Sequence, residues 1–200
     1  MVKMKHLKFN VLAPDVELLT VNGQPLMISS LWQGKVLVLA FTRHFGCPQC
    51  KEMLDRLVKV LPDLSAREIV LAVVTQGTPE QVNVFCKERA PGVLCLADPD
   101  RKAYRAYLID RTTWLASILS PKVIKSNRRL ELEKGWKPEL PPPGQDPLQM
   151  SGLFIIGPDG RIRLPYYYDD ISDHPSLELL LGGVLGMDWS TPLDSLLKPG

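Results

Sequence analysis

Continuous runs of apolar residues predict three buried strands. Residues 36–41 form an unbroken run of β-branched, aliphatic and aromatic side chains, and a similar run occupies residues 68–75. Runs of this length without alternating polar residues are typical of strands that are covered on both faces. A shorter run predicts a third strand at residues 93–96.

Helical periodicity follows the first strand. Apolar residues recur at intervals of three and four between Met53 and Leu61, and charged residues fill the opposite face. We expect this helix to begin at Cys47, with Pro48 in the first turn, where a proline is tolerated. Pro62 is expected to end the helix, because proline lacks the N–H group that a helix interior requires.

The next two helices are predicted from their first residues. Thr78 and Gln81 have the spacing of a capping box, with Pro79 at the first helical position, so a helix is expected from there to about Arg89. Another helix is expected to begin at residues 98–99. Links of a few residues between strands and helices indicate parallel strands with right-handed crossovers.

Hairpins are predicted at both ends of this alternating region. Residues 15–19 and 24–28 flank an Asn-Gly turn, and residues 153–156 and 161–166 flank a Gly-Pro-Asp-Gly turn. The fold class is therefore α/β, with a central mixed sheet flanked by helices. A final helix is expected over residues 175–185, capped by Asp173.

A long segment, residues 112–149, interrupts this pattern before the last hairpin. It contains a Pro-Pro-Pro-Gly run and several basic residues, and a connection of this length is either functional or mobile. We expect a short helix near residues 113–119, a stiff extended linker at the prolines, and a basic cluster that is either a solvated surface or an anion site. The chain is interpreted as one domain over residues 1–200, with its core at about 10–111 and 150–185.

Composition narrows the partners that the protein can have. The 200 residues include 24 basic and 22 acidic side chains, so the net charge of +2 argues against nucleic acid or a membrane surface as the main partner. The first residues show no apolar signal segment, and the apolar stretch at 177–187 is too short to span a bilayer. These features favour a cytoplasmic protein.

The strongest chemical signal is Cys47-Pro48-Gln49-Cys50 between the first strand and its helix. A cysteine at the helix start faces unpaired N–H groups, which favour the thiolate, and Arg43 could add a positive charge. Cys50 lies one turn further along the same face, close enough to form a disulfide with Cys47. We interpret the pair as a redox dithiol in which Cys47 attacks and Cys50 resolves.

Two other uses of these cysteines have to be weighed. A structural zinc site needs two further ligands, and only His44 lies near. The other alternative is that Cys47 and Cys50 are buried core residues with no redox or metal-binding role. We expect Cys86 and Cys95 to be small core residues, and we expect no metal site or cofactor.

Several segments together are similar to one known family. They are residues 13–18, 22–25, 34–39, 43–52, 98–101 and 152–160. The chain resembles the peroxiredoxin-like branch of the alkyl hydroperoxide reductase/thiol-specific antioxidant (AhpC/TSA) superfamily, in which an Arg precedes a Gly-Cys-Pro-x-Cys motif. The resemblance implies a thioredoxin-like fold, thiol-based reduction and a site formed by Cys47 and Cys50.

The chain departs from that family at two places. His44 stands where typical members have a Thr or Ser, and it either shuttles a proton or is a solvated loop residue. Met150-Ser151-Gly152 stands where peroxiredoxins have an Arg and thioredoxins a cis-proline. Gly152 would allow backbone to pass close to the sulfur atoms.

Three functions are compatible with the sequence. The first is an antioxidant thiol peroxidase that reduces peroxides, including bulky apolar ones, through a Cys-x-x-Cys dithiol cycle. The second is a thioredoxin-like thiol–disulfide oxidoreductase, and the third is a non-enzymatic protein that binds a partner through the basic insert. The resemblance implies a peroxide or disulfide substrate, a thioredoxin- or glutathione-type electron donor, and a homodimer as one option for assembly.

Overall fold

The computed structural model describes residues 6–115, 120–183 and 189–190. In this part of the chain a seven-stranded sheet has the order β2-β1-β5-β4-β3-β6-β7. The strands are β1 (Glu17–Thr20), β2 (Pro25–Met27), β3 (Leu37–Phe41), β4 (Val70–Thr75), β5 (Leu94–Ala97), β6 (Gly152–Ile156) and β7 (Ile162–Tyr167). Strands β3, β4 and β5 are parallel, whereas the outer pairs are antiparallel, so the predicted mixed sheet with two hairpins is confirmed.

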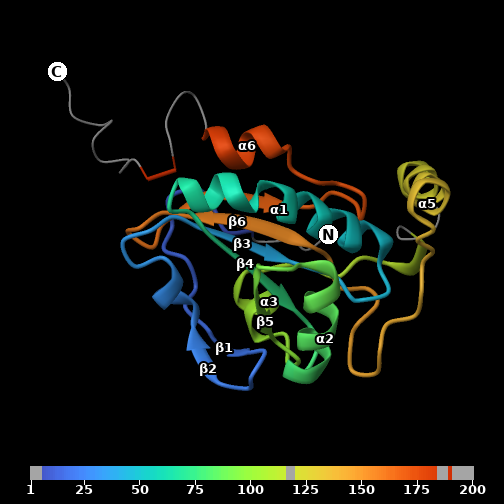
Figure 1. The fold of residues 1–200 in the computed structure, drawn as a ribbon, viewed down its shortest axis with the longest axis horizontal. Helices are drawn as coiled ribbons and strands as arrows, with labels where there is room; N and C mark the ends of the chain where they lie inside the picture. Colours follow the sequence, from blue (N-terminus) through green and yellow to red (C-terminus); the bar gives the residue numbers. More distant parts are fainter. Residues whose placement is uncertain (1–5, 116–119, 184–188, 191–200) are drawn as a thin grey trace.

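The helices surround this sheet. They are α1 (Pro48–Ala66), α2 (Pro79–Arg89), α3 (Lys102–Ala106), α5 (Pro121–Lys134) and α6 (Leu177–Gly182), with one 3-10 turn at Ile28–Leu31. Figure 1 shows α1 and α6 together on one side of the sheet, α3 on the opposite side, and α5 standing at one end. None of the helices in the described ranges is both long enough and apolar enough to cross a membrane.

Strand β3 is the centre of the core. All five of its residues are fully buried, as the unbroken apolar run predicts. Its last residue, Phe41, makes an edge-to-face contact with Tyr104 of α3 and another with Phe154 of β6. The strand is thus covered from both faces, and its carboxyl end delivers residues 42–47 to one edge of the sheet.

Helix α1 does not end at Pro62 as predicted. It continues to Ala66 with Pro62 inside it. The Pro62 side chain is exposed, while Leu64 in the next turn is completely buried. Burial of Leu64 offsets the missing backbone hydrogen bond at the proline.

The cap of the last helix also differs from the prediction. The Ser176 hydroxyl accepts a hydrogen bond from the backbone N–H of Leu179 at 3.2 Å, so Ser176 caps α6. Asp173 instead accepts a hydrogen bond from the Tyr166 hydroxyl at 2.8 Å. Of the predicted helix range 175–185, residues 184 and 185 lie outside the described residues.

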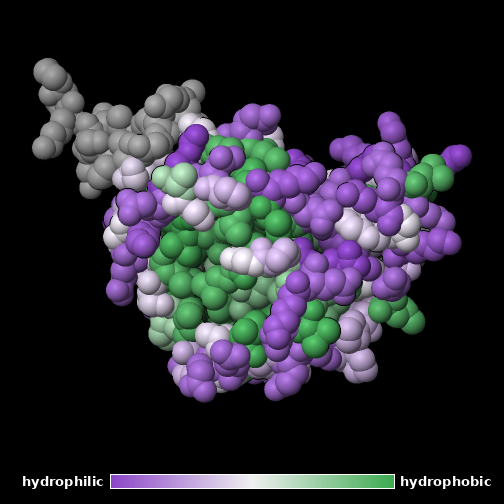
Figure 2. All heavy atoms as spheres, viewed as in Figure 1, coloured by the Kyte–Doolittle hydropathy of each residue, from purple (hydrophilic) through white to green (hydrophobic). Residues whose placement is uncertain are grey.

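The insert contains a long helix that was not predicted. Helix α5 buries only Val123 and Leu130, and Figure 2 shows mostly hydrophilic side chains around it. Ion pairs attach α5 to α1, including Arg129 with Glu52 at 2.8 Å. The basic residues therefore form in part a contact surface within the protein. Of the short helix expected at 113–119, residues 114–115 are helical and 116–119 lie outside the described residues.

Candidate active site

The loop between β3 and α1 positions both candidate cysteines. Cys47 is the N-cap residue of α1, Pro48 occupies the first turn, and Cys50 lies one turn further on, as predicted. Both cysteines are free thiols and almost completely buried, with exposures of 1% and 2%. The Cys47 side chain makes no capping hydrogen bond, although the N–H of Cys50 in the first turn still favours its thiolate form. We refer to residues 42–50 as the floor of the site.

Arg43 is the second component of the floor. Its Nη1 donates to the Cys47 sulfur at 3.5 Å, and its backbone N–H donates to the Cys50 sulfur at 3.2 Å. The guanidinium is also held by the carbonyl of Gln149 at 3.0 Å and by the carbonyl of Pro147 at 2.7 Å. Because these bonds fix the buried side chain, its positive charge stays beside the nucleophile.

Electrostatics divide the two cysteines into different roles. Burial tends to raise the pKa of Cys47, but a hydrogen bond from the Cys50 side chain and the charge of Arg43 together lower it from 9.0 to about 6. Burial and the neighbouring Cys47 raise the pKa of Cys50 well above its ordinary value. At neutral pH Cys47 is therefore a thiolate and Cys50 a thiol, which suits a nucleophile with a resolving partner.

His44 is a buried residue, which corrects the expectation of a solvated loop histidine. Its exposure is 7%, and burial together with the nearby Arg43 lowers its pKa to about 4. The ring is neutral at physiological pH, and its Nδ1 has no hydrogen-bond partner in the described structure. A buried polar atom of this kind is available to a ligand that enters the site.

The far end of the insert covers the floor. We refer to residues 138–149 as the roof. The backbone N–H of Glu139 donates to the carbonyl of Gly46 at 3.0 Å, and the N–H of Phe45 donates to the Gln145 side chain at 3.0 Å. The predicted stiff linker is thus part of the site.

A pocket of about 350 Å³ lies between the roof and the floor. Its lining includes Arg43, His44, Cys47 and Pro48 of the floor. The remaining lining residues are Gly46, Gln49, Trp114, Asn127, Pro138, Glu139, Leu140, Pro141, Pro147 and Ile171. The floor therefore contributes cationic and thiol groups to the lining, and the lining residues outside the floor are mainly apolar.

That Gly152 allows backbone to pass close to the sulfur atoms stays a prediction. A side chain there would meet Ile109 and Phe154, with closest approaches of 3.2 Å. The neighbouring Ser151 is closer to the site, with its hydroxyl 4.0 Å from the Cys50 sulfur. The described backbone contains no cis peptide bond, so the thioredoxin cis-proline has no counterpart at Ser151.

Glutamines are the part of the site that sequence reasoning missed. The side-chain oxygen of Gln49 lies 3.6 Å from the Cys47 sulfur and accepts its hydrogen when Cys47 is protonated, and the Gln49 amide donates to Asn127 of α5 at 2.6 Å. Gln76 donates to the backbone carbonyl of Arg43, and it also accepts from the N–H of Asp146 in the roof at 2.8 Å. The only sequence signal for these glutamines was a position inside the Cys-x-x-Cys motif. That signal identifies Gln49 but not Gln76.

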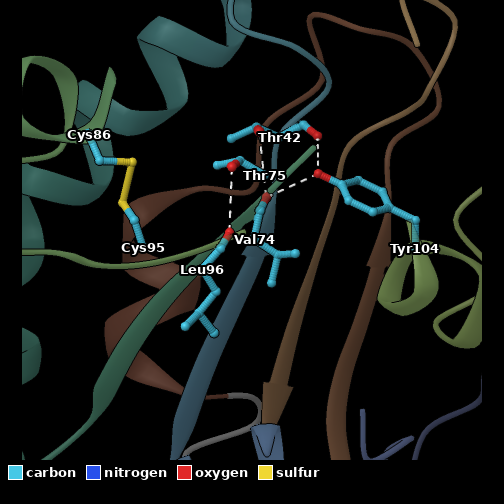
Figure 3. The surroundings of a disulfide bond; sticks show 7 residues. All are labelled: Thr42, Val74, Thr75, Cys86, Cys95, Leu96 and Tyr104. Carbon is cyan, nitrogen blue, oxygen red and sulfur yellow. Dashed lines mark hydrogen bonds between the residues drawn. A yellow bond between two sulfur atoms is a disulfide. The ribbon is translucent and has the colours of Figure 1, made fainter. Parts of the chain in front are cut away.

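The remaining cysteines also form a pair. Cys86 and Cys95, which were predicted to be separate core residues, are joined by a disulfide between α2 and β5 (Figure 3). They are nevertheless buried, as expected. Within the described ranges, no cluster of three or more His, Cys, Asp or Glu side chains could hold a metal ion.

Comparison with known proteins identifies the family. The model of the AhpC/TSA family matches residues 10–164. The chain belongs to this family. Peroxiredoxin-like 2C of Bos taurus is 26% identical over 184 residues, which cover 88% of this chain and 81% of that protein. Prostamide/prostaglandin F synthase of Salmo salar is 28% identical over 164 residues, covering 80% and 79%.

Solved structures agree on the fold of this AhpC/TSA member. The crystal structure of peroxidoxin BcpB from Mycobacterium tuberculosis superimposes with a TM-score of 0.59, covering 81% of this chain and 86% of that one. Its sequence identity is 15%, so the likeness concerns architecture. The expectation of a peroxiredoxin- and thioredoxin-like fold is confirmed.

Proposed function

We propose that the protein reduces hydroperoxides, with Cys47 as the nucleophile and Cys50 as the resolving thiol. One observation carries the proposal. The Cys47 sulfur, whose pKa is lowered to about 6, lies at the bottom of a pocket beside a fixed guanidinium. A thiolate with a cation next to it is suited to attack an oxygen atom and to stabilise the negative charge that leaves.

The proposed cycle uses only the two cysteines and an external thiol donor. The Cys47 thiolate attacks the terminal peroxide oxygen, the O–O bond breaks, and the departing alkoxide takes a proton to become an alcohol. Cys47 is then a sulfenic acid. The Cys50 sulfur attacks it, water leaves, and a Cys47–Cys50 disulfide forms. A thioredoxin- or glutathione-type donor supplies two electrons and restores both thiols.

Arg43 and His44 have distinct roles in this proposal. Arg43 donates a hydrogen bond to the Cys47 thiolate, and it lies close enough to contact the peroxide oxygen that the thiolate attacks. His44 lines the pocket, and its neutral ring can accept one hydrogen bond and donate another. It would orient the peroxide where the family has Thr or Ser.

The substrate proposed here is an organic hydroperoxide with an apolar body. Trp114, Leu140 and Ile171 line the same pocket as the cationic floor. A molecule with one polar end and one apolar end would match both walls. One relative carries the name prostamide/prostaglandin F synthase, which is compatible with a lipid-like substrate.

Thiol–disulfide exchange is the second candidate function. The observation in its favour is that Cys50 lies one turn from Cys47 with the raised pKa of a resolving thiol. Against it, both sulfurs are almost fully buried under the roof in the reduced chain, which is the form that would have to attack a bulky protein disulfide. A small hydroperoxide has less need of an open surface.

A single-turnover experiment separates the two. The reduced chain is mixed with one equivalent of cumene hydroperoxide, hydrogen peroxide or a protein disulfide, and free thiols are counted by mass spectrometry. We expect rapid loss of two thiols with cumene hydroperoxide, no reaction in Cys47→Ser, and a stable Cys47 sulfenic acid in Cys50→Ser. Rapid exchange with the protein disulfide and slow reaction with both peroxides would favour the oxidoreductase and refute the peroxidase.

A further inference from the structure

The Cys86–Cys95 disulfide is one of the few buried attachments of α2 to the sheet. Val82 and Cys86 are the only buried residues of α2, and the remaining side chains are partly or fully exposed. The bond from Cys86 to Cys95 fixes α2 to β5 (Figure 3). A helix with so few buried groups depends strongly on one covalent link for its position.

A pocket gives a small molecule access to this disulfide. It has a volume of about 420 Å³, is separate from the pocket over Cys47, and is lined by both Cys86 and Cys95. Lys87 is the only charged residue in its lining. A cation at the entrance attracts a thiolate, which is the species that attacks disulfides. The cysteines themselves are 5% and 3% exposed, so only a small thiol can reach them.

Helix α2 also contacts the floor of the active site. Phe85, next to Cys86, stacks on Phe45 with ring centroids 4.1 Å apart and an angle of 15°. Phe45 lies two residues before Cys47, and its ring packs so closely on Gly77 that a side chain there would come within 2.7 Å of it. Movement of α2 would therefore displace Phe45 and with it the loop that carries the nucleophile.

The other cysteine has its own connection to the floor. Leu96 follows Cys95 in β5, and its carbonyl accepts a hydrogen bond from the Thr75 hydroxyl at 3.5 Å. Val74 precedes Thr75 in β4. Its carbonyl accepts a hydrogen bond at 3.5 Å from the hydroxyl of Thr42, which is the first residue of the floor (Figure 3). Each cysteine of the disulfide therefore has a neighbour in the chain that makes such a contact. Phe85, next to Cys86, contacts the floor, and Leu96, next to Cys95, contacts strand β4.

We propose that Cys86–Cys95 is a second redox centre, opened by a small thiol, whose state sets the reactivity of Cys47. The thiolate of the small molecule attacks one sulfur of the pair, the S–S bond breaks, and the other cysteine leaves as a thiolate that takes a proton. A second equivalent of thiol attacks the mixed disulfide. Cys86 and Cys95 end as thiols, and the two small thiols end as one disulfide.

The first test asks whether the bond opens in the folded protein. The oxidised full-length chain is incubated with dithiothreitol in native buffer, quenched with N-ethylmaleimide at set times, and analysed by peptide mass spectrometry. We expect Cys86 and Cys95 to become labelled together while circular dichroism stays native. Labelling that requires denaturant would overturn the proposal.

A pair of lysine variants tests the route of entry. Lys87→Glu should slow the reduction about threefold, because the attacking thiolate then meets a negative charge. Lys59→Glu, at an exposed position of α1 outside the lining of this pocket, is the matched control and should leave the rate unchanged. Equal rates in the two variants would contradict entry through this pocket.

The second test measures coupling to Cys47 independently of any enzymatic activity. In a Cys50→Ser chain, Cys47 is alkylated with iodoacetamide at several pH values, with Cys86–Cys95 either intact or replaced by two serines. We expect the rate to change at least about twofold between the two forms.

Phe85→Leu in the disulfide-intact chain should change the Cys47 rate in the same direction, because it removes the stack on Phe45. Val84→Ala, an exposed neighbour on the same helix, should not. If all four proteins react at one rate, the disulfide serves only to hold α2 in place and the coupling is wrong. This result would leave the proposed reduction of hydroperoxides unaffected.

Discussion

The floor and the roof of the pocket differ in how firmly they are held. Every residue of the floor is buried, because β3 and the first turn of α1 fix it from both sides. In the roof, Gln145 and Gln149 are buried, but Leu140 is 87% exposed and most of its neighbours are partly or fully exposed. The buried wall carries the groups that react, and the exposed wall carries those that would contact the substrate's apolar part.

This difference suggests that reactivity and selectivity can change separately. A few bonds join the two walls, among them those from Arg43 to the carbonyls of Pro147 and Gln149. Substitutions of the charged or thiol groups in the floor should alter the reaction with every peroxide, whereas changes that alter or displace the roof should change the ranking of peroxides. The three variants that follow test this separation.

Replacing Arg43 by Met should have the largest effect. Loss of the guanidinium removes a charge that lowers the pKa of Cys47, so that pKa should rise from about 6 toward its ordinary value. The wild-type rate should fall as the pH drops through about 6, where the thiolate is protonated. In Arg43→Met this inflection should move to higher pH, with a loss on the order of tenfold at pH 7 for all peroxides.

The pH profile of thiolate absorbance at 240 nm measures this shift directly. Arg128→Met, which removes an exposed arginine of α5, is the matched control and should keep the wild-type inflection. An unchanged inflection in Arg43→Met would mean that the first turn of α1 and Cys50 alone maintain the thiolate.

The floor was predictable because its signals are local. The apolar run of β3, the cysteine spacing and the proline after Cys47 all lie within a few residues of one another. Arg43 was recognised for the same reason, being four residues before Cys47. The burial of His44 could not be inferred, because the roof that covers the floor lies about a hundred positions away in the chain.

The roof was not predictable, and the reason is physical. Its attachment uses backbone carbonyls and side-chain amides, such as the bond from Phe45 to Gln145, which leave no periodic pattern in a sequence. Helix α5 was missed because Val123 and Leu130, seven residues apart, are its only buried positions. Two apolar positions in a charged segment are too few to indicate a helical face. The disulfide between Cys86 and Cys95 was missed because spacing alone does not define a pairing.

Replacing Gly46 by Ala should separate the roof from the floor. A side chain at Gly46 would overlap the backbone of Glu139, whose carbonyl carbon would lie 2.7 Å away, so the roof has to move. We expect the preference for cumene hydroperoxide over hydrogen peroxide to fall about fivefold, with the reaction of hydrogen peroxide nearly unchanged. Single-turnover rates with the two peroxides measure this ratio.

Gly182→Ala is the control for Gly46→Ala, because nothing lies within 4 Å of a side chain at that position. It should keep the wild-type ratio. Limited digestion with endoproteinase Glu-C gives a second readout, since a displaced roof should be cut faster after Glu139, which lies within it. Equal losses with both peroxides in Gly46→Ala would show that the two walls act as one unit.

The smallest effect is expected from Leu140→Ser, which changes the apolar wall without moving it. Leu140 lines the pocket and is 87% exposed, so its burial by a bound apolar substrate would add favourable contact area. Losing that contact should raise the KM for cumene hydroperoxide about threefold and leave hydrogen peroxide unaffected. Leu132→Ser, an equally exposed leucine of α5 outside the pocket lining, should change neither value. A matching KM increase in both variants would assign the effect to general surface polarity, and the roof would then have no part in recognising the substrate.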